Sequence, residues 1–124
     1  MDTDKFLAAY SEPRNGVNQM YRHPLVRNFT YSDGVKECAE AGMYWLLDVV
    51  ATEALKPLAQ TEYFQGVVAL KVVGSRAIVE LRVEDDAPPI WAKPIEYTDA
   101  PEGEWKFLLA NGGDAFNMIL LSEY

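Results

Sequence analysis

The spacing of the apolar residues changes once along the chain, near residue 63, and this change limits the folds open to it. Before that point apolar residues recur every three or four positions, which is typical of amphipathic helices. After it they recur every second position, which is typical of strands. A chain that places its helices first and its strands afterwards predicts an α+β fold, with the helices packed on one face of a sheet.

Three helices are predicted before the change of period. The first covers Asp2–Tyr10 and the second begins after Ser32, whose hydroxyl can cap it. The second ends at Gly42, because glycine readily adopts the left-handed conformation that terminates helices. The third covers Met43–Leu55 and is expected to end before Pro57. Between the first two helices, the sequence predicts a loop over residues 11–24 and a short strand over residues 29–31.

The second half of the chain predicts strands joined by turns. Gly74 and Ser75 form a two-residue turn of the hairpin type, and Pro94 places its strand at a sheet edge or a bulge. We therefore expect an antiparallel meander of four or five strands under the helices, in a single domain over residues 1–124. The predicted strands are Phe64–Val73, Arg76–Glu84, Ile90–Thr98, Glu104–Leu109 and Phe116–Leu121.

Composition predicts a folded protein of the bacterial cytoplasm. The chain is 49% hydrophobic, which is enough for a core. Its first residues are polar and acidic, unlike a secretory signal, and no apolar run reaches the ~18–20 residues that span a bilayer. The single cysteine, Cys38, excludes an internal disulfide.

No motif in the sequence predicts catalysis or a cofactor. Zinc sites need clustered histidines and cysteines, and this chain has only His23 and Cys38. We expect His23 to be an ordinary loop histidine and Cys38 a small buried residue, although a small enzyme using His23 stays open as the least supported hypothesis. The many acids also leave a carboxylate magnesium site open. The sequence predicts a protein that is not an enzyme and uses no cofactor.

The acidic residues gather in one stretch of the chain. The net charge is −8, and residues 80–104 carry −6 of it, since only Arg82 and Lys93 oppose the acids there. Such a protein is repelled by nucleic acid and attracted to basic surfaces. The acids of this stretch are the predicted partner-binding residues: Glu80, Glu84, Asp85, Asp86, Glu96, Asp99, Glu102 and Glu104.

Two interpretations of this acidic stretch remain open from the sequence. Alternate residues on a strand share a face, so Glu80 and Glu84 would form a row of negative charges with Asp85 and Asp86 at the strand end. Such a row resembles a phosphate backbone, whose charges repeat every ~3.4 Å along each strand, and it could occupy a groove that normally holds nucleic acid. Alternatively, the acids only solubilise an exposed sheet face and protect it from aggregation.

A second hypothesis from a different class uses apolar residues. If Trp91 or Trp105 points outward beside Pro88 and Pro89, the patch could anchor a partner protein, since tryptophan is enriched in interface hot spots. The chain would then be an accessory interaction module of a mobile element.

Several short segments resemble a family of small uncharacterised bacterial proteins that are often encoded on phages, prophages and plasmids. The resemblance rests on residues 29–35, FTYSDGV, and residues 43–48, MYWLLD, with residues 21–23 and 122–124 also similar. It spans most of the chain, and these elements look structural, so the family supplies no site residues. The chain is also similar to anti-CRISPR inhibitors of type I complexes, with subtype I-C as the named candidate. That similarity implies a partner, a basic nucleic-acid-binding surface of a Cas subunit, and no direct contact with nucleic acid or membrane.

Overall fold

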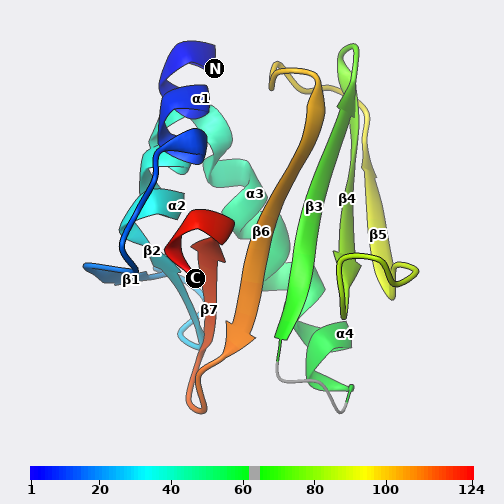
Figure 1. Ribbon diagram of the computed structural model, residues 1–124. Coiled ribbons are helices and arrows are strands. Elements are labelled where there is room, and N and C mark those ends of the chain that lie inside the picture. The colour runs from blue at the N-terminus through cyan, green and yellow to red at the C-terminus, as the bar shows by residue number, and fades with distance from the viewer. Residues whose placement is uncertain (62–64) are drawn as a thin grey trace.

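The computed structural model describes residues 1–61 and 65–124, and its helices and one broad sheet are shown in Figure 1. The helical elements are α1 (Thr3–Ser11), α2 (Asp33–Cys38), α3 (Tyr44–Val49) and α4 (Leu55–Ala59), with two π-helical segments, η1 (Ala39–Met43) and η2 (Val50–Ala54), and a C-terminal 3-10 turn, η3 (Leu121–Glu123). The strands are β1 (Met20–Arg22), β2 (Phe29–Ser32), β3 (Gln65–Val73), β4 (Arg76–Arg82), β5 (Trp91–Ile95), β6 (Gly103–Asn111) and β7 (Phe116–Leu120).

The helix starts follow the capping residues predicted from the sequence. The Asp2 side chain accepts a hydrogen bond from the Lys5 amide at 3.0 Å, and the Ser32 hydroxyl accepts one from the Val35 amide at 3.1 Å. Gly42 has a φ of 127° and separates the α2 and α3 segments, as expected from the sequence. The described helix continues beyond Pro57, contrary to expectation. The π-helical segment η2 leads directly into α4, with the Leu55 amide bonded to the Val50 carbonyl, so the regular i→i−4 pattern that proline interrupts is already broken before Pro57.

All seven strands belong to one sheet with the order β1-β2-β7-β6-β3-β4-β5. Strands β2 and β7 run parallel, and every other neighbouring pair is antiparallel. The α+β class is therefore confirmed, but the prediction of an antiparallel meander of four or five strands is wrong. The predicted strand start at Phe64 lies outside the described residues.

The meander prediction fails because of where the early strands pair. β1 lies inside the segment predicted as loop, and its three residues are too few to show a period. β2 is the short strand that the sequence predicts. Its parallel partner β7 starts 87 positions later, and no local pattern encodes a contact between such distant segments. The insertion of β6 between β7 and β3 is equally non-local.

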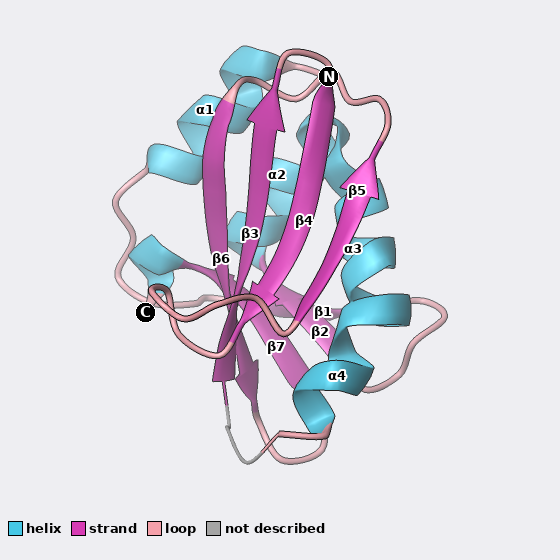
Figure 2. Cartoon of the chain, turned by 90° about the vertical axis from the view of Figure 1, so that its right-hand side faces the viewer, coloured by secondary structure: helices cyan, strands magenta, loops and turns pink. Residues whose placement is uncertain are grey.

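The helices cover one face of the sheet and the core lies between the two layers (Figure 2). On β4 the alternation is as predicted, with Ala77, Val79 and Leu81 buried on the helix side. Pro94 lies on β5, which is the edge strand that its proline predicts. The other face of β5, β4, β3 and β6 turns toward the viewer in Figure 2 with no helix in front of it, and we call it the open face.

Candidate interaction surface

The eight acids predicted to bind a partner do not form one row. Glu80 and Glu104 lie on strands at the open face, while Glu84, Asp85 and Asp86 lie in the β4–β5 loop, residues 83–90. Glu96, Asp99 and Glu102 lie between β5 and β6, at the opposite end of the strands. The predicted proximity of Glu80 to the loop acids is partly realised, but cations from other strands intervene.

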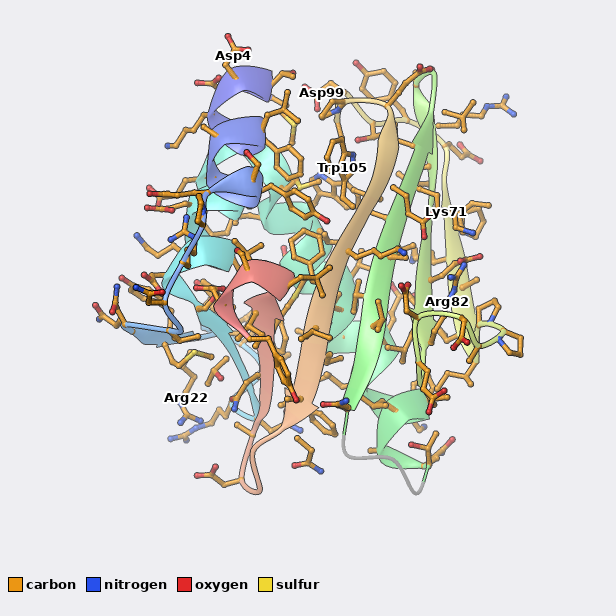
Figure 3. The ribbon with its side chains drawn as sticks, in the orientation of Figure 1. Asp4, Arg22, Lys71, Arg82, Asp99 and Trp105 are labelled. Atoms are coloured by element: carbon orange, nitrogen blue, oxygen red, sulfur yellow. The ribbon has the colours of Figure 1, made fainter. Side chains whose placement is uncertain are left out.

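On the open face Glu80 is enclosed by two cations. Its carboxylate lies 3.1 Å from the Lys71 ammonium of β3 and 2.6 Å from the Arg82 guanidinium of its own strand. Burial raises the pKa of the Glu80 carboxyl, but the hydrogen bonds from Arg82 and Lys71 outweigh burial and hold the pKa below its usual value. Figure 3 shows Lys71 and Arg82 on the side of the sheet away from α1 and α2. Glu80 is therefore a neutralised part of a network and not a free negative charge.

Lys106 of β6 joins two more of the predicted acids to this network. Its ammonium lies 2.7 Å from Asp85 and 3.7 Å from Glu104. The hydrogen bond that the Lys106 ammonium donates to the Asp85 carboxylate raises the pKa of Lys106. Because β3 lies between β4 and β6, the ion pair between Asp85 and Lys106 spans β3 and holds the β4–β5 loop against the open face. The middle of the open face is thus a mixed network of both signs.

Two acids near the start of β6 also have local partners. Asp99 pairs with the Met1 amine, and this hydrogen bond lowers the pKa of the Asp99 carboxyl. Glu102 accepts a hydrogen bond from the Gly74 amide at 2.6 Å and so clips the β3–β4 turn to the β5–β6 connection. The positive φ of Gly74, 62°, allows this tight turn.

Three of the eight acids are exposed and have neither an ion pair nor a side-chain hydrogen bond among the described residues: Glu84, Asp86 and Glu96. The first two project from the β4–β5 loop, and the third follows β5. Their exposure makes them the acids of the predicted set that are available to an outside partner.

The open face also carries an apolar groove at the β3–β4 turn end of the strands. Its volume is about 760 Å³, and Val73, Ile78 and Pro94 line it together with Arg76 and Glu96. Val73 is 79% exposed and Ile78 is 43% exposed. Sequence reasoning did not select these residues, although Ile78 is the apolar residue that interrupts the alternation of β4, and this irregularity is the signal that could have found the groove.

Neither tryptophan proposed as an outward anchor is placed for that role. Trp105 packs edge-on against Phe6 and Tyr10 of α1, with ring centroids 5.1 and 5.2 Å away, and donates to the Pro101 carbonyl at 2.8 Å. Figure 3 shows Trp105 between α1 and the sheet. Trp91 also packs partly buried against the core. The condition of the apolar-anchor hypothesis, an outward-pointing Trp91 or Trp105, is therefore not met.

His23 holds a loop in place. Its ring is 4% exposed, and its Nδ1 atom accepts hydrogen bonds from the Leu25 and Val26 amides at 3.1 Å each. Because Nδ1 accepts, Nε2 carries the proton and donates to Asp48 of α3 at 2.8 Å. Both ring nitrogens are occupied, so the geometry favours a structural role for His23 over acid–base chemistry.

The segments that carry the family resemblance meet in space. The buried Glu123 carboxylate near the chain end accepts hydrogen bonds from the Ser32 hydroxyl at 2.5 Å, the Gly34 amide at 3.2 Å and the Leu120 amide at 2.8 Å. A Cβ on Gly34 would lie 2.7 Å from a methyl group of Leu120 and 2.8 Å from the Glu123 carboxylate, so any other residue there would displace these side chains. These segments thus lock the C-terminal turn onto the start of α2, as the structural interpretation of the motifs predicted.

Two features are absent from the described part of the chain, residues 1–61 and 65–124. No group of three or more histidine, cysteine, aspartate or glutamate side chains in that part of the chain is arranged to hold a metal ion. None of the described helices has the length and apolar character required to cross a membrane.

The fold and the surface define an α+β domain with a mixed sheet, an acidic loop and an apolar groove on one uncovered face. The chain belongs to a family of unknown function (DUF6876), which matches residues 8–124. No curated protein and no solved structure gave a significant match. Function must therefore be argued from the surface itself.

Proposed function

We propose that this chain is a non-catalytic binding protein that places its acidic β4–β5 loop, residues 83–90, on a basic surface of a partner protein. The partner surface is one that otherwise holds nucleic acid, so an occupied surface cannot bind its nucleic acid. The observation that supports this proposal best is the state of the loop, which is anchored at its base and presents two carboxylates without a counter-charge in the described chain.

The anchoring of the loop rests on three contacts. The Arg82 guanidinium donates to the Asp85 carbonyl at 2.9 Å, and the Asp85 carboxylate pairs with Lys106 at 2.7 Å. The Ala87 amide donates to the Glu84 carbonyl at 3.2 Å and closes a turn. A loop that is already ordered loses less conformational entropy on binding. Less of the attraction between its charges and the partner is then offset by the ordering of the loop.

The charges of the loop suit a basic partner. Glu84 and Asp86 are exposed on either side of the anchored Asp85, and the whole chain carries a net charge of −8. Oppositely charged surfaces accelerate encounter and select partners, and this attraction is screened over ~8–10 Å at physiological salt. The similarity to anti-CRISPR inhibitors makes a nucleic-acid-binding subunit of a type I Cas complex the first partner to test.

The proposal is tested by capture from a lysate of a bacterium that carries a type I CRISPR system. The loop variant is Glu84→Lys with Asp86→Lys, which leaves the Asp85–Lys106 ion pair intact and changes the net charge from −8 to −4. The matched control is Asp4→Lys with Asp114→Lys, which changes the charge equally at exposed positions outside the loop. Surface substitutions of this kind usually change stability by about 0.5 kcal/mol or less.

We expect wild type and the matched control to capture the same nucleic-acid-binding protein, and the loop variant to retain about a tenth of it or less. Circular dichroism checks that all three proteins are folded. Equal capture by the loop variant, or a captured protein with no affinity for nucleic acid, would show that the loop acids only confer solubility.

A further inference from the structure

The groove on the open face has an apolar floor that no other part of the described chain covers. Val73 of β3, Ile78 of β4 and Pro94 of β5 come from three adjacent strands and form this floor. An aliphatic side chain left in water forgoes about 25 cal/mol for each Å² that burial would remove from solvent. The floor therefore gains free energy when a second surface packs on it.

Two side chains of opposite charge lie next to each other at one end of this floor. Arg76 and Glu96 line the groove and are exposed. The register of β4 and β5 pairs Ala77 with Ile95, so Arg76 and Glu96 occupy the next positions on the two strands. Among the described residues neither makes an ion pair, whereas Lys71, Arg82 and Lys106 on the same face are all paired. The groove thus keeps one unpaired cation and one unpaired anion beside an apolar centre.

We propose that a second copy of this chain docks on the groove, open face to open face. A two-fold axis requires that the same patch serve both subunits, so the patch must complement itself. A patch with an apolar centre, one cation and one anion meets that requirement, because the rotation places Arg76 of each copy near Glu96 of the other. The apolar centres then pack together, as in the buried core of a dimer interface.

Local charge favours a second copy over a highly charged partner. Among the charged residues that line the groove, Arg76 and Glu96 offset each other, and Lys71 pairs with Glu80 just outside it, so the groove carries little net charge. A balanced, apolar patch offers little attraction to nucleic acid or to a strongly basic protein. The lining residues Val73 and Arg76 place the groove next to the β3–β4 turn. The acidic β4–β5 loop lies at the other end of the strands (Figure 1). The self-association therefore goes beyond the proposed function.

The test exchanges the two charges in separate proteins. Arg76→Glu gives a subunit with two acids at the patch, and Glu96→Arg gives a subunit with two cations. Each variant alone would bring like charges together twice across the two-fold axis, and we expect its dimer to weaken about tenfold or more. An equimolar mixture of the two variants would restore both attractive pairs and form a heterodimer. Sedimentation velocity measures the dimers, and native mass spectrometry identifies the mixed species.

Matched controls change the net charge by the same amount at exposed positions away from the groove: Lys56→Glu for the first variant and Asp4→Lys for the second. We expect both controls to dimerise like wild type, and Val73→Asp to abolish the dimer by placing a charge in its centre. A monomeric wild type at the highest soluble concentration would overturn the proposal. So would folded Arg76→Glu and Glu96→Arg proteins that remain monomeric when mixed. Since Glu84 and Asp86 are unchanged in all of these variants, failure here would leave the proposed function untouched.

Discussion

Glu123 is the residue on which the end of the chain depends most directly. Its carboxylate is buried and satisfies a hydroxyl and two backbone amides from β2, α2 and β7. Buried donors that lose their acceptor cannot turn to water instead. One side chain thus joins the C-terminal turn to the first helix that follows the parallel strand.

Removing this carboxylate should destabilise the fold strongly. We expect Glu123→Ala to lower the free energy of unfolding by at least about 2 kcal/mol, since each orphaned buried donor costs about 1–3 kcal/mol. Glu123→Gln keeps one acceptor oxygen and should lose less. The neighbouring Tyr124→Ala, at an 85% exposed position, serves as the control. Urea denaturation measures the stability of these variants. Equal denaturation midpoints for Glu123→Ala and Tyr124→Ala would show that the Glu123 carboxylate does not stabilise the chain end.

Cys38 makes the stability of the fold decrease at alkaline pH. Burial raises the pKa of its thiol from 9.0 to about 12. Above pH 9 the unfolded chain releases the thiol proton, while the folded chain retains it until near pH 12. The unfolded state then binds fewer protons, so the free energy of unfolding falls as the pH rises through this window.

The Cys38→Ala variant isolates this effect. Burial also raises the pKa of Tyr31, and both proteins keep that residue, so it cancels in the comparison. Between about pH 7 and about pH 10, wild type should lose about 1 kcal/mol more stability than Cys38→Ala. Urea unfolding at the two pH values measures the difference. Parallel pH dependences would mean that the thiol is not desolvated.

At the scale of elements, the loop between β1 and β2 is held by the pairing of His23 with Asp48. The imidazole accepts two backbone hydrogen bonds from the loop and donates one to α3. It thereby fastens an early loop to the helix that covers the sheet. The residues of this pair lie in two of the segments on which the family resemblance rests.

We expect His23→Ala to free this loop locally. The Leu25 and Val26 amides lose their acceptor, so their hydrogen exchange should accelerate, and stability should fall by about 1–3 kcal/mol. Asp48→Asn keeps an acceptor for Nε2 and should retain most of the protection. Exchange measured by NMR at these two amides distinguishes the outcomes. Unchanged protection in His23→Ala would show that the imidazole does not organise the loop.

The elements that the sequence predicts well are those with local signals. Ser32 marks the start of α2, Gly42 marks the break before α3, and Pro94 marks the edge strand, because caps, left-handed glycines and prolines act within a few residues. The sheet order depends instead on contacts between distant strands. The parallel pairing of β2 with β7 arises only when the whole core assembles, so local periodicity does not reveal it.

At the scale of the whole molecule, the sequence identifies the sign of the surface charge but not its distribution. The stretch from Glu80 to Glu104 is rich in acids, but two of the cations that pair with them lie outside it. Lys71 and Lys106 lie on neighbouring strands and neutralise Glu80 and Asp85. Of the predicted row, Glu84 and Asp86 of the loop and Glu96 keep free carboxylates in the described part of the chain. Which acids are paired depends on the three-dimensional arrangement of the strands, and the sequence does not show it.

Competition for a nucleic-acid site tests the central claim of a charge-based blocking protein most directly. A purified type I Cas complex is mixed with labelled target DNA, and fluorescence anisotropy reports how much DNA stays bound as the protein is added. We expect wild type to displace the DNA, less effectively as salt rises, and the Glu84→Lys/Asp86→Lys variant to require about tenfold more protein or more. DNA that stays bound at saturating wild type, or equal displacement by the folded loop variant, would contradict the claim.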